Sequence, residues 1–261
     1  MLFDSMLPVL FTIGSFKVYT FGFFLALSFI LSTFIIWKYA KEDLKEEEYL
    51  DAFLYTSIAA LVSARLLYIM LNFEEFGLNI LRYIVVREAP GLSLLGGLSG
   101  GFTFFYWYAK QKRLDFSHLL DLFSVAACFA LSFAKIGEQL AGGAFGRETN
   151  FFLSVKVVGA IGRYHPVELY ESFLFLLLAI LLLLIYNKIR LRKLPKGLAF
   201  SLFTLGAVLV VFLLEFMKVH SVYLYGLSFN QIIAILIIIV LLKPLIDQIK
   251  AIIFLKKEKK G

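Results

Sequence analysis

Ionised side chains inside long apolar stretches are the residues of this sequence most able to do chemistry. A charge at the centre of a bilayer costs about 2.5–3.5 kcal/mol, so such a group at membrane depth is usually paired or functional. Each one is therefore either a candidate for binding or catalysis or half of an ion pair. The residues of this kind are Arg65, Lys135, Glu138, Glu168, Glu171 and Glu215.

For Arg65 and for the pair Lys135 and Glu138, a structural role competes with a functional one. Arg65 shares a helix face with Tyr68, three residues on, and it suits either an ion pair with a carboxylate of another helix or an anion-binding role. Lys135 and Glu138 have the spacing of a helical i, i+3 pair. If the helix continues through Gly137, this pair forms and weakens Lys135 as a phosphate ligand.

The three glutamates divide between two helix ends. Glu168 and Glu171 share a face just after Pro166, a residue that suits the first turn of a helix, where carboxylates complement the helix dipole. Capping alone explains one of them, and Glu168 is the better candidate for that role. Glu215 lies near a helix end where Lys218 can reach it, and simple snorkelling to the interface is the competing explanation.

His165 is the histidine whose neighbours suggest chemistry. It precedes Pro166 directly and lies between Arg163 and Glu171 in the sequence. A structural role and an acid–base role both remain open for it.

Long apolar runs must position these residues. The chain is 61% hydrophobic and only 17% charged, against about 25% charged in a typical soluble domain. We therefore predict an all-α integral membrane protein, a single multi-span domain over residues 1–261. A bilayer span needs about 20 apolar residues. Seven expected transmembrane helices cover residues 19–39, 49–71, 92–109, 116–134, 166–186, 197–217 and 227–242, followed by a basic tail at 243–261.

The distribution of basic residues predicts an orientation. Most of the 26 Lys and Arg residues fall on one side of the membrane if the N-terminus lies outside, so we expect a cytoplasmic C-terminus. The outer side then holds the segments 72–91 and 137–165, the second rich in glycine. The net charge of +7 serves orientation, and we expect no nucleic-acid partner. A single cysteine, Cys128, excludes an internal disulfide and a cysteine-rich metal cluster.

Six segments in order resemble the bacterial prolipoprotein diacylglyceryl transferases. They are SARLLYIM around Arg65, GLSLLGGLSGG from Gly91, KIGEQLAGGAFGRETN from Lys135, HPVELYES from His165, LLEFMKV from Leu213 and GLSFNQIIAI from Gly226. The resemblance implies a multi-pass enzyme of the bacterial plasma membrane that moves the diacylglyceryl group of phosphatidylglycerol onto the lipobox cysteine of a prolipoprotein. It implies membrane lipid as a partner and neither a cofactor nor a metal.

The resemblance also implies site residues. Catalytic candidates are His165, Glu171 and Glu215. Arg147 and Arg163 supply charge for the phosphate, and the amides of Gly142, Gly143 and Gly146 are donors close to it. The remaining substrate-binding candidates are Lys135, Glu138, Arg65, Tyr68, Gly96 and Gly97.

Several positions depart from the family pattern. Leu95 replaces a histidine, Lys135 and Glu138 replace an arginine and an asparagine, Gly143 replaces a glutamate, and Val211 replaces an arginine. Lysine keeps the charge of arginine but loses its bidentate fork. Two hypotheses follow: a working transferase, which the HPVELYE and GAFGR segments favour, or a non-catalytic relative that binds or moves lipid or scaffolds a partner.

Overall fold

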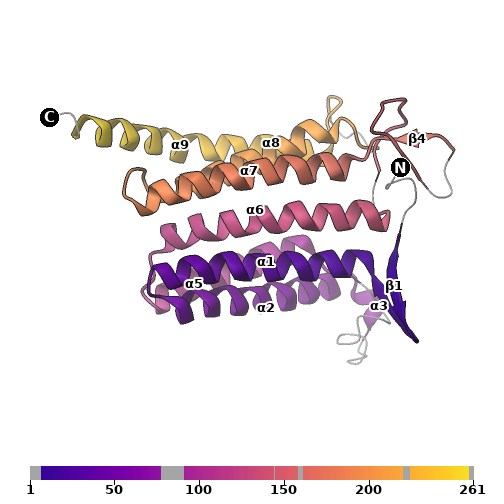
Figure 1. Cartoon of the computed structure of the whole chain (residues 1–261), viewed down its shortest axis with the longest axis horizontal. Helices are drawn as coiled ribbons and strands as arrows, with labels where there is room; N and C mark the ends of the chain where they lie inside the picture. Colours follow the sequence, from indigo (N-terminus) through magenta and orange to yellow (C-terminus); the bar gives the residue numbers. More distant parts are fainter. Residues whose placement is uncertain (1–6, 78–90, 144, 158–160, 220–223, 259–261) are drawn as a thin grey trace. The chain divides into compact units, whose positions relative to one another are not determined.

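A computed structural model describes residues 7–77, 91–143, 145–157, 161–219 and 224–258 (Figure 1). Parts of the two expected outer segments, residues 78–90, 144 and 158–160, lie outside this set, as do the last three residues of the expected tail. Helices dominate the described chain, and the expectation of an all-α membrane protein is confirmed.

Seven long helices follow the seven apolar runs. They are α1 (Thr20–Glu42), α2 (Glu46–Leu71), α5 (Leu94–Gln111), α6 (Phe116–Ala141), α7 (Val167–Arg190), α8 (Leu198–Glu215) and α9 (Phe229–Glu258). The described residues also contain a short helix, α3 (Phe73–Phe76), and four strands: β1 (Val9–Ile13), β2 (Phe16–Tyr19), β3 (Val155–Lys156) and β4 (Arg163–Tyr164). Six of the long helices are apolar enough to span a bilayer. The exception is α5, an 18-residue helix that ends in Lys110 and Gln111 and also contains four glycines, Ser99 and Thr103.

The chain forms two compact units, which are described separately. Unit 2 comprises residues 36–119, and its main contact joins α2 to α5. Glycines make this contact close: a Cβ on Gly96 would lie 2.6 Å from the carbonyl oxygen of Ser63, and one on Gly100 would lie 2.0 Å from the Ser63 hydroxyl. Small residues that let two backbones approach are a common way to pack helices in lipid, where the hydrophobic effect between helices is absent.

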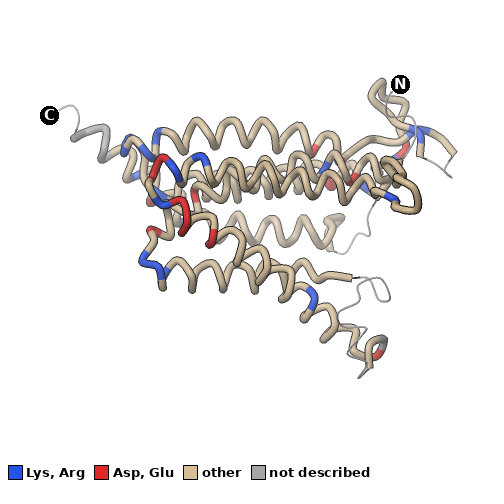
Figure 2. Tube along the Cα trace, turned by 60° about the horizontal axis from the view of Figure 1, so that its bottom comes forward, with Lys and Arg blue, Asp and Glu red and all other residues tan. Residues whose placement is uncertain are grey.

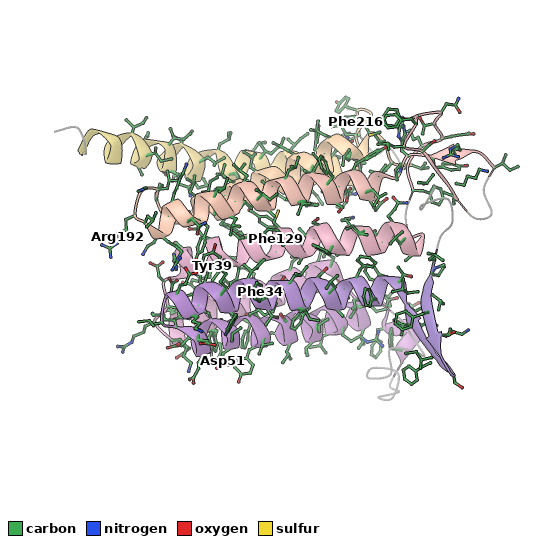
Figure 3. The ribbon with its side chains drawn as sticks, in the orientation of Figure 1. Phe34, Tyr39, Asp51, Phe129, Arg192 and Phe216 are labelled. Atoms are coloured by element: carbon green, nitrogen blue, oxygen red, sulfur yellow. The ribbon has the colours of Figure 1, made fainter. Side chains whose placement is uncertain are left out.

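Unit 1 comprises residues 1–35 and 120–261 and contains α7, α8, α9 and most of α6. Polar side chains join these helices through their backbones. The Ser132 hydroxyl donates to the carbonyl of Ser172 at 3.0 Å, and the Cys128 thiol to that of Phe175 at 3.2 Å. Within unit 1, Figure 3 shows Arg192 at the turn between α7 and α8 and Phe216 at the opposite end of α8. These two residues mark the two ends of the unit.

At the Phe216 end of unit 1, irregular β-structure joins the chain segments between the helices. β3 pairs with β4, the Glu148 segment pairs with Tyr164, and Gly146 pairs with Lys218, all antiparallel. We call residues 145–149, 155–156, 163–165 and 217–218 the end layer. Its strand-like segments follow the order 155–156, 163–165, 145–149, 217–218, so β3 lies at one edge. The layer holds the chain just after α6, just before α7 and just after α8.

Candidate active site

Five charged side chains meet beside the end layer, and we call them the charged cluster: Lys135, Glu138, Glu168, Glu171 and Lys218. The ammonium of Lys135 lies 2.8 Å from Glu138 Oε2 and 2.7 Å from Glu171 Oε2. The ammonium of Lys218 lies 2.6 Å from Glu171 Oε1 and 3.3 Å from Glu168 Oε1. Each oxygen of Glu171 therefore holds one ammonium group. The expected pairing of Lys135 with Glu138 is confirmed, because α6 continues through Gly137.

Burial separates the charges of the cluster. The side chains of Glu171 and Glu168 are 2% and 1% exposed, whereas those of Lys135 and Lys218 are 21% and 23% exposed. The carboxylates of Glu168 and Glu171 thus lie behind the ammonium groups, whereas the Glu138 side chain is 34% exposed and shares the more open side with the two lysines. An anion at the open side of the cluster meets the ammonium groups of Lys135 and Lys218 together with the carboxylate of Glu138, and partial desolvation strengthens its electrostatic interaction with each of them.

Lys218 remains a cation in these surroundings. It lies beyond the end of α8, where burial, the largest single influence, lowers the pKa of its ammonium. Hydrogen bonding to Glu171 and the negative charges of Glu171 and Glu168 outweigh burial, so the pKa of Lys218 is raised above its ordinary value.

Glu168 and Lys218 are members of the cluster that the sequence analysis left out of the candidate site. Glu168 lies in the first turn of α7, as expected of a residue that complements the helix dipole. It is also fully buried, and neither of its carboxylate oxygens accepts a hydrogen bond from the described residues. The signal available in the sequence was the shared face of Glu168 and Glu171, which brings one cation near both.

Glu215 makes different contacts from those expected. Its Oε1 atom accepts hydrogen bonds from the Ser228 hydroxyl and the Asn230 amide, both at 2.9 Å, while the Lys218 ammonium lies on Glu171 and Glu168. Lys218 was expected to be within reach of Glu215, and its ammonium forms ion pairs with two glutamates of α7. Ser228 and Asn230 belong to the start of α9, so the buried Glu215 ties the end of α8 to α9. The catalytic role expected for Glu215 stays a prediction.

Backbone contacts bring His165 and the Gly146 segment next to Lys218. A Cβ on Gly146 would lie 2.9 Å from His165 Cβ and 2.7 Å from the carbonyl oxygen of Met217, so only glycine fits here without a shift. Arg147 is exposed, its amide donates to Met217 at 2.7 Å, and its Nε donates to the carbonyl of Lys218 at 3.4 Å. His165 is half-buried, with Nδ1 at 3.3 Å from the Tyr170 hydroxyl.

The glycine amides donate hydrogen bonds to backbone carbonyls. The amides of Gly142 and Gly143 donate to the carbonyls of Gln139 and Glu138, and the amide of Gly146 donates to the carbonyl of His165. The first two close the end of α6, where Gly142 has a left-handed φ of 77°. In this conformation the three amides stabilise the local backbone, and their expected role as phosphate donors stays a prediction.

Arg163 belongs to unit 1 but is not part of the charged cluster, and the remaining candidates belong to unit 2. The Nε of Arg163 donates to the Ser154 hydroxyl at 2.9 Å, which braces the β3–β4 hairpin. In unit 2, Arg65 donates to the carbonyl of Gly91 at 3.0 Å and lies 5.1 Å from the centre of the Phe76 ring.

The other unit 2 candidates have close neighbours. The Tyr68 ring packs against Gly91, and Gly96 and Gly97 face α2. Their predicted roles in substrate binding, like those of Arg65 and Arg163, stay predictions.

Comparison with known proteins identifies the relatives of this chain. The family model for prolipoprotein diacylglyceryl transferase matches residues 8–246. A phosphatidylglycerol–prolipoprotein diacylglyceryl transferase 1 of Clostridium perfringens is 30% identical, over 89% of this chain and 91% of the relative. A phosphatidylglycerol–prolipoprotein diacylglyceryl transferase of Finegoldia magna is 28% identical, over 88% of this chain and 91% of the relative. One of Synechocystis sp. is 25% identical, over 91% of this chain and 87% of the relative. The chain belongs to the prolipoprotein diacylglyceryl transferase family.

Proposed function

We propose that this protein transfers the diacylglyceryl group of phosphatidylglycerol to the cysteine thiol of a prolipoprotein lipobox. Family membership and the names of its relatives support the reaction. The observation that carries the proposal for this chain is the charged cluster, whose two partly exposed ammonium groups lie on a buried carboxylate. Such an arrangement holds two cations in fixed positions for one phosphodiester anion.

The reaction sets the tasks of the residues. The thiol loses its proton, the sulfur attacks the glyceryl carbon, and the bond from that carbon to the phosphate oxygen breaks. Glycerol phosphate leaves, and it takes up a proton in place of the one that the thiol gave up. Lys135 and Lys218, with the exposed Arg147 nearby, offset the charge that grows on the phosphate oxygen as the bond breaks.

His165 is the proposed acceptor of the thiol proton. If its Nδ1–H donates to the Tyr170 hydroxyl at 3.3 Å, its Nε2 is left as an acceptor. Glu171 acts at a distance from the thiol in this scheme, because it is buried and holds both ammonium groups. Its proposed role is to position Lys135 and Lys218.

The proposed location is the bacterial plasma membrane, with the charged cluster on the outer side. The described residues include six helices that are long and apolar enough for a multi-pass membrane protein. Lys and Arg residues gather at the α7–α8 turn, the end of unit 1 away from the cluster (Figure 2). The amide of Leu7 bonds to the carbonyl of Leu140 at 2.8 Å, close to the cluster, which supports an outside N-terminus.

The direct test is transfer by the purified protein. Bilayers containing labelled phosphatidylglycerol and a lipobox peptide should yield a thioether-linked diacylglyceryl peptide. Lys135→Ala should lower the rate at least tenfold, because it removes a cation from the cluster, whereas Lys193→Ala removes an exposed lysine of the α7–α8 turn and should have little effect. Equal effects of the two substitutions would assign Lys135 a purely structural role.

A non-catalytic lipid-binding protein is the second candidate function. The observation that favours it is the full pairing of the Lys135 ammonium with Glu138 and Glu171, together with the departures at Leu95 and Val211. This reading predicts saturable binding of phosphatidylglycerol with no product above a control lacking the protein. Product formation in the same assay would rule it out.

A further inference from the structure

A cavity of about 810 Å³ lies beside the first turns of α7, away from the charged cluster. Its walls come from the chain segment 152–155, from β4 and from α7, and its lining is largely apolar. The residues that α7 contributes are Leu169, Tyr170, Phe173 and Leu174. Polar groups are few, with Ser154 and Arg163, which bond to each other, among them. The volume is that of a site for one medium-sized ligand or for a short stretch of chain.

The helical period of α7 separates this cavity from the charged cluster. Leu169, Tyr170 and Phe173 repeat with the three- and four-residue spacing of one face, whereas Glu168 and Glu171 belong to the neighbouring buried face. The same two turns of helix therefore carry charge on one side and an apolar cavity wall on the other. Two ligands of different chemistry could be bound at the same time, one on each face.

The cavity also adjoins the edge of the end layer. β3 pairs with β4 through Val155 and Tyr164, and among the residues that the structure describes no strand pairs with the other edge of β3. Val155 itself lines the cavity. An open strand edge beside apolar pockets is a recurring arrangement for binding an extended peptide, whose backbone pairs with the edge while its side chains fill the pockets.

His165 connects the cavity with the reacting groups. The Tyr170 hydroxyl lies 3.3 Å from His165 Nδ1, and Tyr170 lines the cavity. On its other side, the backbone of His165 pairs with Gly146 and Arg147, whose segment is bridged to Lys218. A chain lying in the cavity therefore ends near the histidine that the proposed reaction needs.

We propose that this cavity and the edge of β3 bind the peptide substrate, as an extended apolar segment next to its acceptor cysteine. The inference rests on the proposed function, which requires two substrates. The phosphodiester suits the paired ammonium groups of the cluster, and the apolar peptide suits the cavity. Among the described residues that line the cavity, Arg163 alone is charged, and it is bonded to Ser154. Acyl chains of membrane lipid are the competing occupant.

Steady-state kinetics with both substrates separate these occupants. Leu169→Trp fills the cavity and should raise the KM for the peptide about tenfold or more, with the KM for phosphatidylglycerol unchanged. Leu177→Trp is the matched control, because Leu177 is exposed on the same side of α7 but lies outside the cavity lining. A rise in the KM for the lipid alone, or equal effects of both substitutions, would overturn the proposal.

Cross-linking tests binding without catalysis and without a buried substitution. Phe173 is 60% exposed, so a photoreactive benzoylphenylalanine at this position should leave the fold intact. We expect a saturable adduct with a lipobox peptide that excess unlabelled peptide displaces and phosphatidylglycerol does not. An adduct with lipid that peptide leaves unchanged, or no peptide adduct at all, would overturn the proposal. Peptide adducts in a protein without transferase activity would instead refute the catalytic proposal alone.

Discussion

Glu171 and Glu168 are two buried glutamates three residues apart on α7, and their contacts predict that the same substitution destabilises the protein much more at Glu171 than at Glu168. Glu171 accepts an ammonium on each oxygen, at 2.7 and 2.6 Å, whereas Glu168 has one ammonium at 3.3 Å and no hydrogen-bond donor among the described residues. Removing one partner of a buried ion pair costs about 3–5 kcal/mol, because the other charge is left uncompensated. Glu171→Gln removes the carboxylate that the ammonium groups of Lys135 and Lys218 share.

The expected cost of Glu171→Gln lies at the lower end of that range, about 3 kcal/mol, because the two ammonium groups keep some solvent and the neighbouring Glu138 and Glu168. Glu168→Gln loses one long contact and also removes a buried carboxylate without hydrogen-bond donors, so it should cost less than about 1 kcal/mol. The difference of about 2 kcal/mol corresponds to about a 30-fold difference in the folding equilibrium.

The free energy of unfolding in mixed detergent micelles, measured for both variants against the unsubstituted protein, checks the difference. Lys218→Met added to Glu171→Gln should cost less than Lys218→Met alone, because the two residues share one contact. Equal costs for the two glutamates, or additive costs in the double variant, would refute the description of Glu171 as the centre of the cluster.

Three further predictions test the surroundings of the site. Gly146→Ala should destabilise the protein by about 1–3 kcal/mol, because the new Cβ would lie 2.6 Å from Val167 Cγ2. A Cβ on Gly22 in α1 would meet nothing within 4 Å, so Gly22→Ala should be neutral or stabilising. Chemical denaturation measures the stability of both variants, and equal costs would contradict the close approach at Gly146. Asp121→Ala should lower the free energy of unfolding by about 2 kcal/mol, because Asp121 accepts hydrogen bonds from the amides of Gly197 and Phe200 at the start of α8. Asp121→Asn should lower it less, because asparagine keeps one acceptor oxygen. The same assay checks this order, and a larger loss with asparagine would contradict it. The contribution of Lys218 to stability should be fully present below the ordinary lysine pKa of 10.5 and should disappear as the pH rises through the raised pKa of Lys218. Lys218→Met should therefore lower the free energy of unfolding by the same amount at pH 7 and pH 9. A smaller loss at pH 9 would contradict the raised pKa.

Hydropathy predicted the helices because the bilayer requires long apolar runs, but it did not predict where each helix ends. The apolar run over residues 116–134 stops before Lys135, while α6 continues to Ala141. Backbone hydrogen bonding continues past a charged residue when that residue finds a partner, as Lys135 does in Glu138 and Glu171. Hydropathy stops at the charge, and the helix carries that charge into the site.

Contacts within one helix could be predicted, and contacts between helices could not. The spacing of Lys135 and Glu138 encodes their pairing directly. The contacts of Glu171 with Lys135 and Lys218 depend on how α6, α7 and the chain after α8 pack, and no local spacing encodes them. For the same reason sequence spacing places Lys218 within reach of Glu215 but gives no sign of its ion pairs with Glu168 and Glu171 on α7.

Two lysines divide the carboxylate oxygens of Glu171 between them. A guanidinium can bind both oxygens of a carboxylate in one plane, whereas an ammonium is a point charge that usually satisfies one. In this chain Lys135 takes one oxygen of Glu171, and Lys218, from the segment after α8, takes the other. The two together make the paired contact that one arginine fork could make alone. The proposed anion site is therefore built jointly by α6, α7 and the chain after α8, and its geometry depends on the end layer, where the backbone of Gly146 pairs with that of Lys218.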